Sequence, residues 1–167
     1  NYPVPGLVVA AFHMTLNISR TTPLNDYGII YEENVLQPDG IPENFFSNKD
    51  VRKAVAHLID FNMLLTVQLL GEAYQCSTVA PDRLPYVYGN VTKYSYNEAT
   101  AKAYFAAAEF KNATDPAVKL TSVGFTLKIQ HNSINTIRQA VAQQLAASIN
   151  KIAGEEGWSF TAAAQSV

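Results

Sequence analysis

Few residues in this chain are of the types that bind metals or transfer protons, and they are widely separated. The three histidines are His13, His57 and His131. A transition-metal site needs several ligands within bonding distance of one ion, so a site here would require the fold to bring distant segments together. The sequence alone therefore predicts no metal site, and we expect structural or surface roles for the histidines.

The other reactive groups also lack a catalytic pattern. Cys76 is the only cysteine, which excludes an internal disulfide, and no Lys, Arg or His flanks it to activate the thiol. The adjacent pairs Glu32–Glu33 and Glu155–Glu156 fall in segments of loop composition, where we expect solvated charge. No glycine-rich phosphate loop or Gly-x-Ser-x-Gly elbow is present. We expect no enzyme; a hydrolase with a Ser or Thr nucleophile is the last alternative, because no activating base can be assigned.

Tyrosines gather in one segment that prolines and a glycine mark as a loop. The segment is residues 77–95; its tyrosines are Tyr86, Tyr88 and Tyr94, and Tyr96 follows it directly. Aromatic rings with hydroxyl tips can stack on an amphipathic ligand, or they can cover a helix. We expect the loop to pack on a neighbouring surface, and contact with a ligand stays the alternative.

Three Asn-x-Ser/Thr triplets begin at Asn17, Asn90 and Asn112. Such a triplet accepts an N-linked glycan only in an exported protein. Triplets of this kind also arise by chance in a chain rich in Asn, Ser and Thr, so the sequence leaves their meaning open.

The composition indicates one compact domain, or a piece of a larger one, with a polar surface. The chain has 167 residues, of which 16% are charged, against about 25% in a typical soluble protein. A net charge of −2 provides no field that attracts nucleic acid or anionic lipid. The longest apolar run, residues 7–12, is far shorter than the roughly 20 residues that cross a bilayer. We therefore expect no nucleic-acid partner, and any signal segment or membrane anchor would lie outside these residues.

Hydrophobic spacing predicts the first elements. Residues 7–18 are expected to form a strand, and residues 19–46, rich in turn formers, an irregular connection. Ser47 and Asp50 resemble a capping box, which predicts a helix as far as residue 59. Asp60 is placed to cap a second, short helix over residues 63–70, which Gly71 would end.

The second half of the chain predicts a βαβ unit. Asn97 is a good cap for a helix that ends near residue 110. Residues 123–130 alternate between apolar and polar, as in a strand buried on one face, and residues 135–152 carry a helical apolar stripe that Gly154 would end. A last strand is expected over residues 158–164. A strand, a helix and a second strand that follow one another over residues 123–164 are typical of a βαβ unit, in which the two strands are parallel. The sequence therefore predicts an α/β fold.

Several short motifs, weak alone but in a consistent order, resemble one family of proteins. They are Phe45-Phe46-Ser-Asn-Lys-Asp50-Val51-Arg52-Lys-Ala54 with Ile59-Asp60, then Gly71-Glu-Ala73, the prolines Pro81 and Pro85, Tyr96-Asn97-x-x-x-Ala101-Lys102, and Phe125 to Asn132. From about residue 7 to residue 160, the chain resembles the family 5 solute-binding proteins of peptide, dipeptide and nickel ABC importers. It departs from the family in having Asn97 for a common Asp and His131 where Tyr is frequent.

The resemblance implies a fold and a function. The chain is similar to part of the second lobe of a periplasmic-binding-protein-type fold, with a mixed sheet flanked by helices, and is expected to form a single domain. The family captures a small solute outside the membrane and delivers it to an ABC permease without breaking a bond or using a cofactor. We expect a peptide as the solute, in an extracellular or periplasmic protein anchored through parts outside this chain. A sugar or a metal chelate stays open.

By position in the family, the resemblance implies that His13, Met14 and Asn132 contact the solute. Packing or capping of a strand end is the alternative role for each. Because the other lobe supplies further contacts, this chain alone is expected to bind solute poorly. The alternative function, of another class, is a stand-alone protein-interaction domain that uses the tyrosine-rich loop over residues 86–96.

Overall fold

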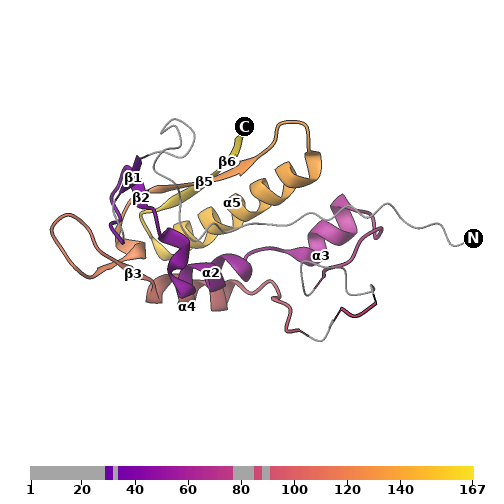
Figure 1. Cartoon of the computed structure of the whole chain (residues 1–167), viewed down its shortest axis with the longest axis horizontal. Helices are drawn as coiled ribbons and strands as arrows, with labels where there is room; N and C mark the ends of the chain where they lie inside the picture. Colours follow the sequence, from indigo (N-terminus) through magenta and orange to yellow (C-terminus); the bar gives the residue numbers. More distant parts are fainter. Residues whose placement is uncertain (1–28, 32–33, 77–84, 88–90) are drawn as a thin grey trace, which may run out of the picture.

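A computed structural model describes residues 29–31, 34–76, 85–87 and 91–167 of the chain (Figure 1). The strands are β1 (Ile29–Tyr31), β2 (Gly40–Pro42), β3 (Glu109–Phe110), β4 (Val118–Lys119), β5 (Thr126–His131) and β6 (Thr161–Ser166). The helices are η1 (Phe45–Ser47), α2 (Lys49–Ala56), α3 (Phe61–Met63), η2 (Leu64–Gln68), α4 (Glu98–Ala107), η3 (Leu120–Ser122) and α5 (Thr136–Glu156). The strand expected over residues 7–18 lies outside the described residues.

The strands confirm the α/β fold class and the predicted βαβ unit. Within the described residues they form three two-stranded pairs, of which β1–β2 and β5–β6 are parallel and β3–β4 is antiparallel. Helix α5 connects β5 to β6 and runs along both strands (Figure 1). The connection over residues 19–46 is less irregular than expected, because it contains β1 and β2.

Helix α2 begins and ends within a few residues of the predicted bounds. Its N-cap is Asn48 rather than Ser47, because the Asn48 Oδ1 atom accepts hydrogen bonds from the backbone N–H groups of Asp50 and Val51, at 3.0 and 3.3 Å. The helix ends at Ala56 instead of residue 59. Asp60 caps the next helix by accepting from Met63 N at 2.9 Å, and an N-cap residue has non-helical backbone angles, so α2 cannot continue through it.

The short helix that Asp60 caps begins at Phe61, two residues before the predicted start at residue 63, and changes from an α-helix to a π-helix along its length. After α3 it continues as the π-helix η2. Leu70 and Gly71 then adopt positive φ angles of 48° and 81°. The helix ends at Gln68, and the residue after its C-cap Leu69 is the left-handed Leu70, so the prediction that Gly71 ends this helix was wrong by one position.

Helices α4 and α5 both begin after an asparagine cap, of which only Asn97 was predicted, and both end at other residues than predicted. Asn97 accepts from Thr100 N at 2.9 Å, and Asn135 accepts from Arg138 N at 2.9 Å. Helix α5 passes through Gly154 and ends at Gly157, which has a φ of 68°. A glycine inside a helix costs only about 1 kcal/mol relative to alanine, so the prediction that Gly154 ends α5 was wrong.

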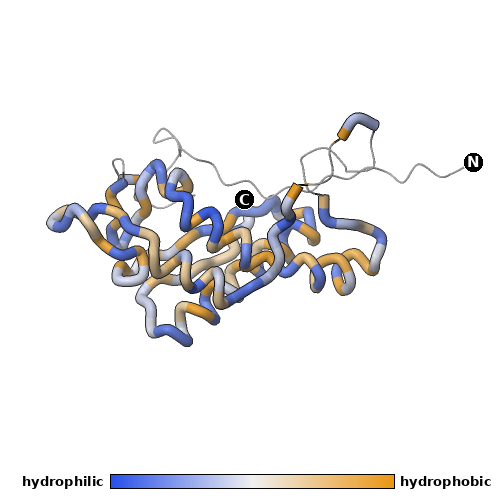
Figure 2. The backbone as a smooth tube through the Cα atoms, turned by 90° about the horizontal axis from the view of Figure 1, so that it is seen from below, coloured by the Kyte–Doolittle hydropathy of each residue, from blue (hydrophilic) through white to orange (hydrophobic). Residues whose placement is uncertain are grey.

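The core is one cluster that joins all the larger elements. Along β5, Leu127 and Ile129 are buried, while Thr126 and Lys128 are exposed, as the alternation predicts. These strand residues share the cluster with the apolar stripe of α5 and with a group of rings: Phe45, Phe105, Phe110, Phe125 and Phe160. Figure 2 shows hydrophobic and hydrophilic residues alternating along the elements, as expected when each element buries one side.

Two side-chain amides of α5 connect this helix to its neighbours. The Gln144 side chain donates to Leu58 O at 3.0 Å and accepts from Asp60 N at 3.3 Å. Asn150 donates to Ala162 O at 2.8 Å and accepts from Ala162 N at 2.7 Å. These bonds satisfy the backbone of the turn after α2 and of the outer edge of β6, which would otherwise depend on water.

The glutamates near the end of α5 were expected to be solvated charges in a loop; both are exposed, but their placement in a loop was wrong. Glu155 and Glu156 lie in the last turn of α5 and both pair with Lys102 of α4, at 2.8 and 2.9 Å. Lys151 pairs with Glu98 of α4 at 2.7 Å. The ends of the two helices are thus joined by an ion-pair network that sequence spacing cannot reveal.

Replacement of Phe45 tests the aromatic part of the core. The Phe45 ring is 1% exposed and stacks on Phe110 with centroids 5.4 Å apart. Because a buried cavity remains, we expect Phe45→Ala to lower the free energy of unfolding by about 3–5 kcal/mol in a urea titration. Tyr86→Ala is the control, since Tyr86 is 107% exposed; equal effects of the two substitutions would contradict the packing described here.

Glu98 makes part of the stability dependent on pH. Lys151 donates to both carboxylate oxygens, at 2.7 and 2.8 Å, and Tyr96 donates at 2.5 Å, which lowers the pKa of Glu98. A lowered folded-state pKa stabilises the protein above the unfolded carboxyl pKa of about 4.3, and this contribution is lost as pH falls through the folded value. We expect Glu98→Gln to lower the urea midpoint slightly at neutral pH, and this difference should shrink as the pH falls below about 4.3. A difference that grows in acid would contradict this assignment.

Candidate functional site

The carboxyl ends of β5 and β6 meet the first turn of α5, and we name this region the strand-end edge. It consists of His131, Asn132, Asn135, Arg138 and residues 165–167. In open α/β sheets, ligands bind outside the carboxyl ends of parallel strands, where loops and helix N-termini present polar groups. The predicted contact Asn132 lies here.

Backbone hydrogen bonds fix the turn at this edge. Val167 N donates to His131 O at 2.9 Å, and Ser133 N donates to Val167 O at 3.2 Å. Asn135 N donates to Asn132 O at 3.3 Å, after which the Asn135 side chain caps α5. The position of Asn132 is therefore set by both strands and by the helix.

The Asn132 side chain makes only one weak contact with the described residues. Its Oδ1 atom lies 3.4 Å from Nη1 of Arg138, which is exposed, and Asn132 itself is half-buried. A hydrogen bond of this length is weak. The amide can therefore donate to and accept from a solute at little cost to the fold.

The His131 side chain lies on the buried side of β5. It is 8% exposed, and its Nδ1 atom lies 3.3 Å from the backbone oxygen of Asn132. The imidazole therefore belongs to the core side of the strand rather than to a surface that a solute contacts.

Gln165 brings a second amide to the edge. It pairs in register with Gln130, one residue before the end of β6, and its buried Oε1 atom has no hydrogen-bond partner among the described residues. Burial of an unsatisfied acceptor costs about 1–3 kcal/mol. Such an atom can accept from a ligand that enters beside it.

The structure tests the position of only one of the three predicted contacts. His13 and Met14 lie outside the described residues, so whether they join Asn132 stays a prediction. Arg138 and Gln165 were not predicted as site residues from the sequence. Arg138 follows the cap Asn135 by three residues and so had to lie in the first turn of the helix, while Gln165 was missed because the last strand was predicted to end at residue 164.

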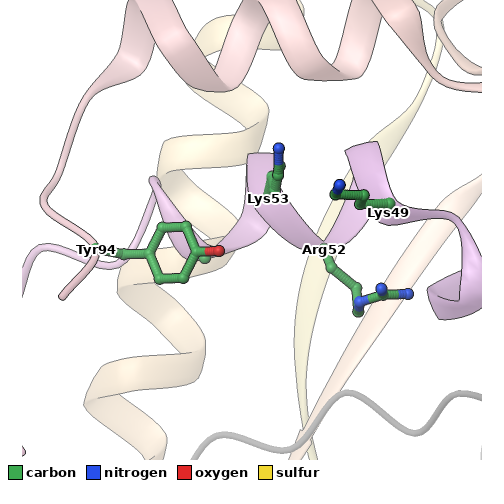
Figure 3. A pocket seen from close by; sticks show the side chains of 5 residues that line it. Lys49, Arg52, Lys53 and Tyr94 are labelled. Carbon is green, nitrogen blue, oxygen red and sulfur yellow. The ribbon is translucent and has the colours of Figure 1, made fainter. Parts of the chain in front are cut away.

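An open hollow of about 220 Å³ lies elsewhere, on α2 (Figure 3). Its lining is Lys49, Arg52, Lys53, Ala56 and Tyr94. Arg52 donates to the backbone oxygens of Phe46 and Ser47, and Lys53 donates to the Tyr104 hydroxyl at 3.2 Å. The Lys53 and Arg52 side chains point in different directions in Figure 3, so these cations do not converge on one ligand.

The described tyrosines of the 86–96 loop are exposed. Tyr86 is 107% exposed, so the prediction that it packs on a neighbouring surface was wrong. Tyr94 contacts the His57 ring with centroids 5.2 Å apart, and Tyr96 donates to Glu98. Both keep part of the ring in solvent, and Tyr88 lies outside the described residues.

Two features are absent from the described residues, a cluster of metal ligands and a membrane-spanning helix. No group of three or more His, Cys, Asp or Glu side chains is arranged to hold a metal ion in this part of the chain. None of the helices found there is long and apolar enough to cross a membrane.

Substitution of two asparagines at the strand-end edge tests which side chain stabilises the fold and which is available to a solute. Asn135 caps α5, so Asn135→Ala should lower the free energy of unfolding by about 1 kcal/mol. Asn132→Ala should change it by less than about 0.5 kcal/mol, because the side chain makes only the long contact with Arg138. Urea titrations of both variants measure the difference, and a larger effect of Asn132→Ala would show that this side chain is structural.

Solved structures of low sequence identity share the fold. NikZ from Campylobacter jejuni, in complex with Ni(L-His), has a TM-score of 0.54 and 21% identity, over 74% of this chain and 24% of that one. NikA from Staphylococcus aureus, in complex with Ni(L-His)2, has a TM-score of 0.56 and 20% identity, over 74% of this chain and 23% of that one. The chain thus spans about a quarter of the length of these structures.

A comparison with curated proteins found no match. A family model, "Bacterial extracellular solute-binding proteins, family 5 Middle", matches residues 4–154. This range contains most of the chain, including β5 and Asn132, and it agrees with the resemblance that the sequence motifs carry. The chain therefore belongs to the family 5 extracellular solute-binding proteins.

Proposed function

We propose that this chain is part of the second lobe of a binding protein that captures a solute outside the cell membrane and delivers it to an ABC permease. The family match over residues 4–154 is the observation that carries the proposal. The fold and the partial coverage of NikZ and NikA support a fragment of one lobe. In two-lobed binders the solute lies between the lobes, which close around it by a hinge.

The strand-end edge would supply one wall of the solute site. Asn132 offers an amide that the fold does not need, and Gln165 offers a buried acceptor without a partner. Arg138 adds a positive charge beside Asn132. His13 and Met14 are proposed as further contacts from the segment that precedes the described residues. The rest of the site would come from the other lobe.

We favour a peptide as the solute. Each peptide unit presents one N–H donor and one C=O acceptor, and a side-chain amide such as that of Asn132 matches both. NikZ and NikA are in complex with Ni(L-His) and Ni(L-His)2, so a metal chelate is the main alternative solute. A chelate carries carboxylates, which would depend on Arg138 more than on the amides.

The proposal excludes a bond-breaking step at this edge. The Nδ1 atom of His131, the group best suited to act as a base, lies beside a backbone oxygen and is buried with the core. A nucleophile would need a base within hydrogen-bond reach. The proposed chemistry is therefore reversible binding, with no cofactor.

The exposed tyrosines favour one alternative. Tyr86 and Tyr94 are 107% and 46% exposed, and tyrosine is enriched at protein interfaces. A domain that binds another protein through the 86–96 loop would also explain them. This alternative predicts that changes in the loop, and not at Asn132, abolish binding.

Titration calorimetry of the full-length protein tests the proposal. We expect heat with a pool of short peptides and none with oligosaccharides or with Ni(II)–histidine. Asn132→Ala should weaken peptide binding about tenfold, since one hydrogen bond to a solute contributes about 1.4 kcal/mol.

Asn62→Ala is the matched control, because Asn62 is an exposed asparagine on α3. Heat with Ni(II)–histidine alone would contradict the peptide proposal, and absence of binding to all three solute classes would contradict solute capture. Equal affinities of the two variants would move the site away from the strand-end edge.

A further inference from the structure

The turn between β3 and β4 contains one of the three glycosylation triplets, Asn112-Ala113-Thr114. Phe110 and Val118, at the ends of the two strands, are buried. Between them the turn is exposed except for the half-buried Asn112. The triplet thus lies on the surface of the folded protein, between two buried strand residues.

Asn112 organises this turn through its side-chain oxygen. Its Oδ1 atom accepts from Thr114 N at 2.9 Å, from Thr114 Oγ1 at 3.2 Å and from Asp115 N at 2.6 Å. The backbone N–H of Asn112 donates to Asp115 O at 2.9 Å. The side chain and the backbone therefore fix one conformation of the turn, an Asx turn.

These bonds also orient the amide nitrogen. The backbone N–H groups of Thr114 and Asp115 can only donate, so the atom of Asn112 that faces them must be the oxygen. The Nδ2 atom is bonded to the same carbon and points away from these donors. Within the described residues Nδ2 has no hydrogen-bond acceptor, so no contact has to break before it reacts.

Backbone hydrogen bonds of Lys111 fix the start of the turn. Lys111 N donates to Asn34 O at 2.6 Å, and Leu36 N donates to Lys111 O at 2.7 Å. A group attached to Asn112 would extend outward from this anchored position. Because Phe110 and Val118 pack inside, the attached group would not enter the core.

We infer that Asn112 is an acceptor site for N-linked glycosylation in a cell that exports the protein past an oligosaccharyltransferase for Asn-x-Ser/Thr triplets. The inference rests on the proposed function only in requiring export. The Nδ2 atom attacks C1 of the first sugar of a lipid-linked oligosaccharide, and an N–C bond forms. The C1–O bond to the lipid phosphate breaks, the phosphate leaves with the electron pair, and a base of the oligosaccharyltransferase takes the proton from Nδ2.

Two features separate Asn112 from other asparagines. Thr114 supplies the hydroxyl that the triplet requires, and this hydroxyl already lies beside the Asn112 amide. Asn132 is also half-buried in a turn but is followed by Ser133 and Ile134, so it lacks the triplet. The inference does not extend to Asn17 and Asn90, which lie outside the described residues.

Secretion from a eukaryotic cell line tests the inference independently of solute binding. The full-length protein is fused to a signal peptide of the host, and peptides of the secreted protein are analysed by mass spectrometry. We expect a glycan on the peptide that contains Asn112, its loss in Asn112→Gln and Thr114→Ala, and its retention in Thr114→Ser. The peptide that contains Asn132 is the unmodified internal control.

Secreted protein with an unmodified Asn112 would overturn the inference, as would a glycan that persists in Thr114→Ala. Because the host supplies the signal peptide, neither result depends on whether the protein binds a solute. The urea midpoint of the secreted protein, before and after enzymatic removal of the glycan, gives a second readout. A midpoint that shifts by as much as that of Phe45→Ala would show that the attached group disturbs the core.

Discussion

The packing of α5 against the parallel pair β5–β6 is the constraint on which the rest of the structure depends. Parallel strands need a crossover to run in the same direction, and α5 provides it while burying its apolar stripe on the strands. Asn150 satisfies the outer backbone of β6, and Gln144 fixes the turn after α2. The same packing brings both strand ends and the first turn of α5 together, so the geometry of the candidate site follows from the core.

Local signals predicted the parts of the fold that depend on neighbours in sequence. The alternation around Leu127 and Ile129 predicted β5, the cap Asn97 predicted where α4 begins, and the apolar stripe over residues 135–152 predicted α5. The choice between adjacent polar residues, Ser47 or Asn48, was not predictable, because both can cap a helix and the observed bonds decide.

Long-range contacts account for what the sequence could not predict. Lys102 pairs with Glu155, 53 residues away, and no local pattern reports such a contact. The same holds for the site, where Asn132 was expected from its place at a strand end but Gln165 becomes relevant only when β6 lies beside β5. A buried acceptor without a partner is visible only in three dimensions, although its cost to folding is general.

Hydrogen exchange of the full-length protein, with and without a bound peptide, tests the central claim most directly: the strand-end edge is one wall of a solute site. The claim predicts that bound solute slows exchange of the amides in residues 132–138, with little change in α2, whose hollow binds nothing in this account. Slower exchange confined to residues 85–96, with none at the strand ends, would contradict it and favour the tyrosine-rich loop as the binding surface.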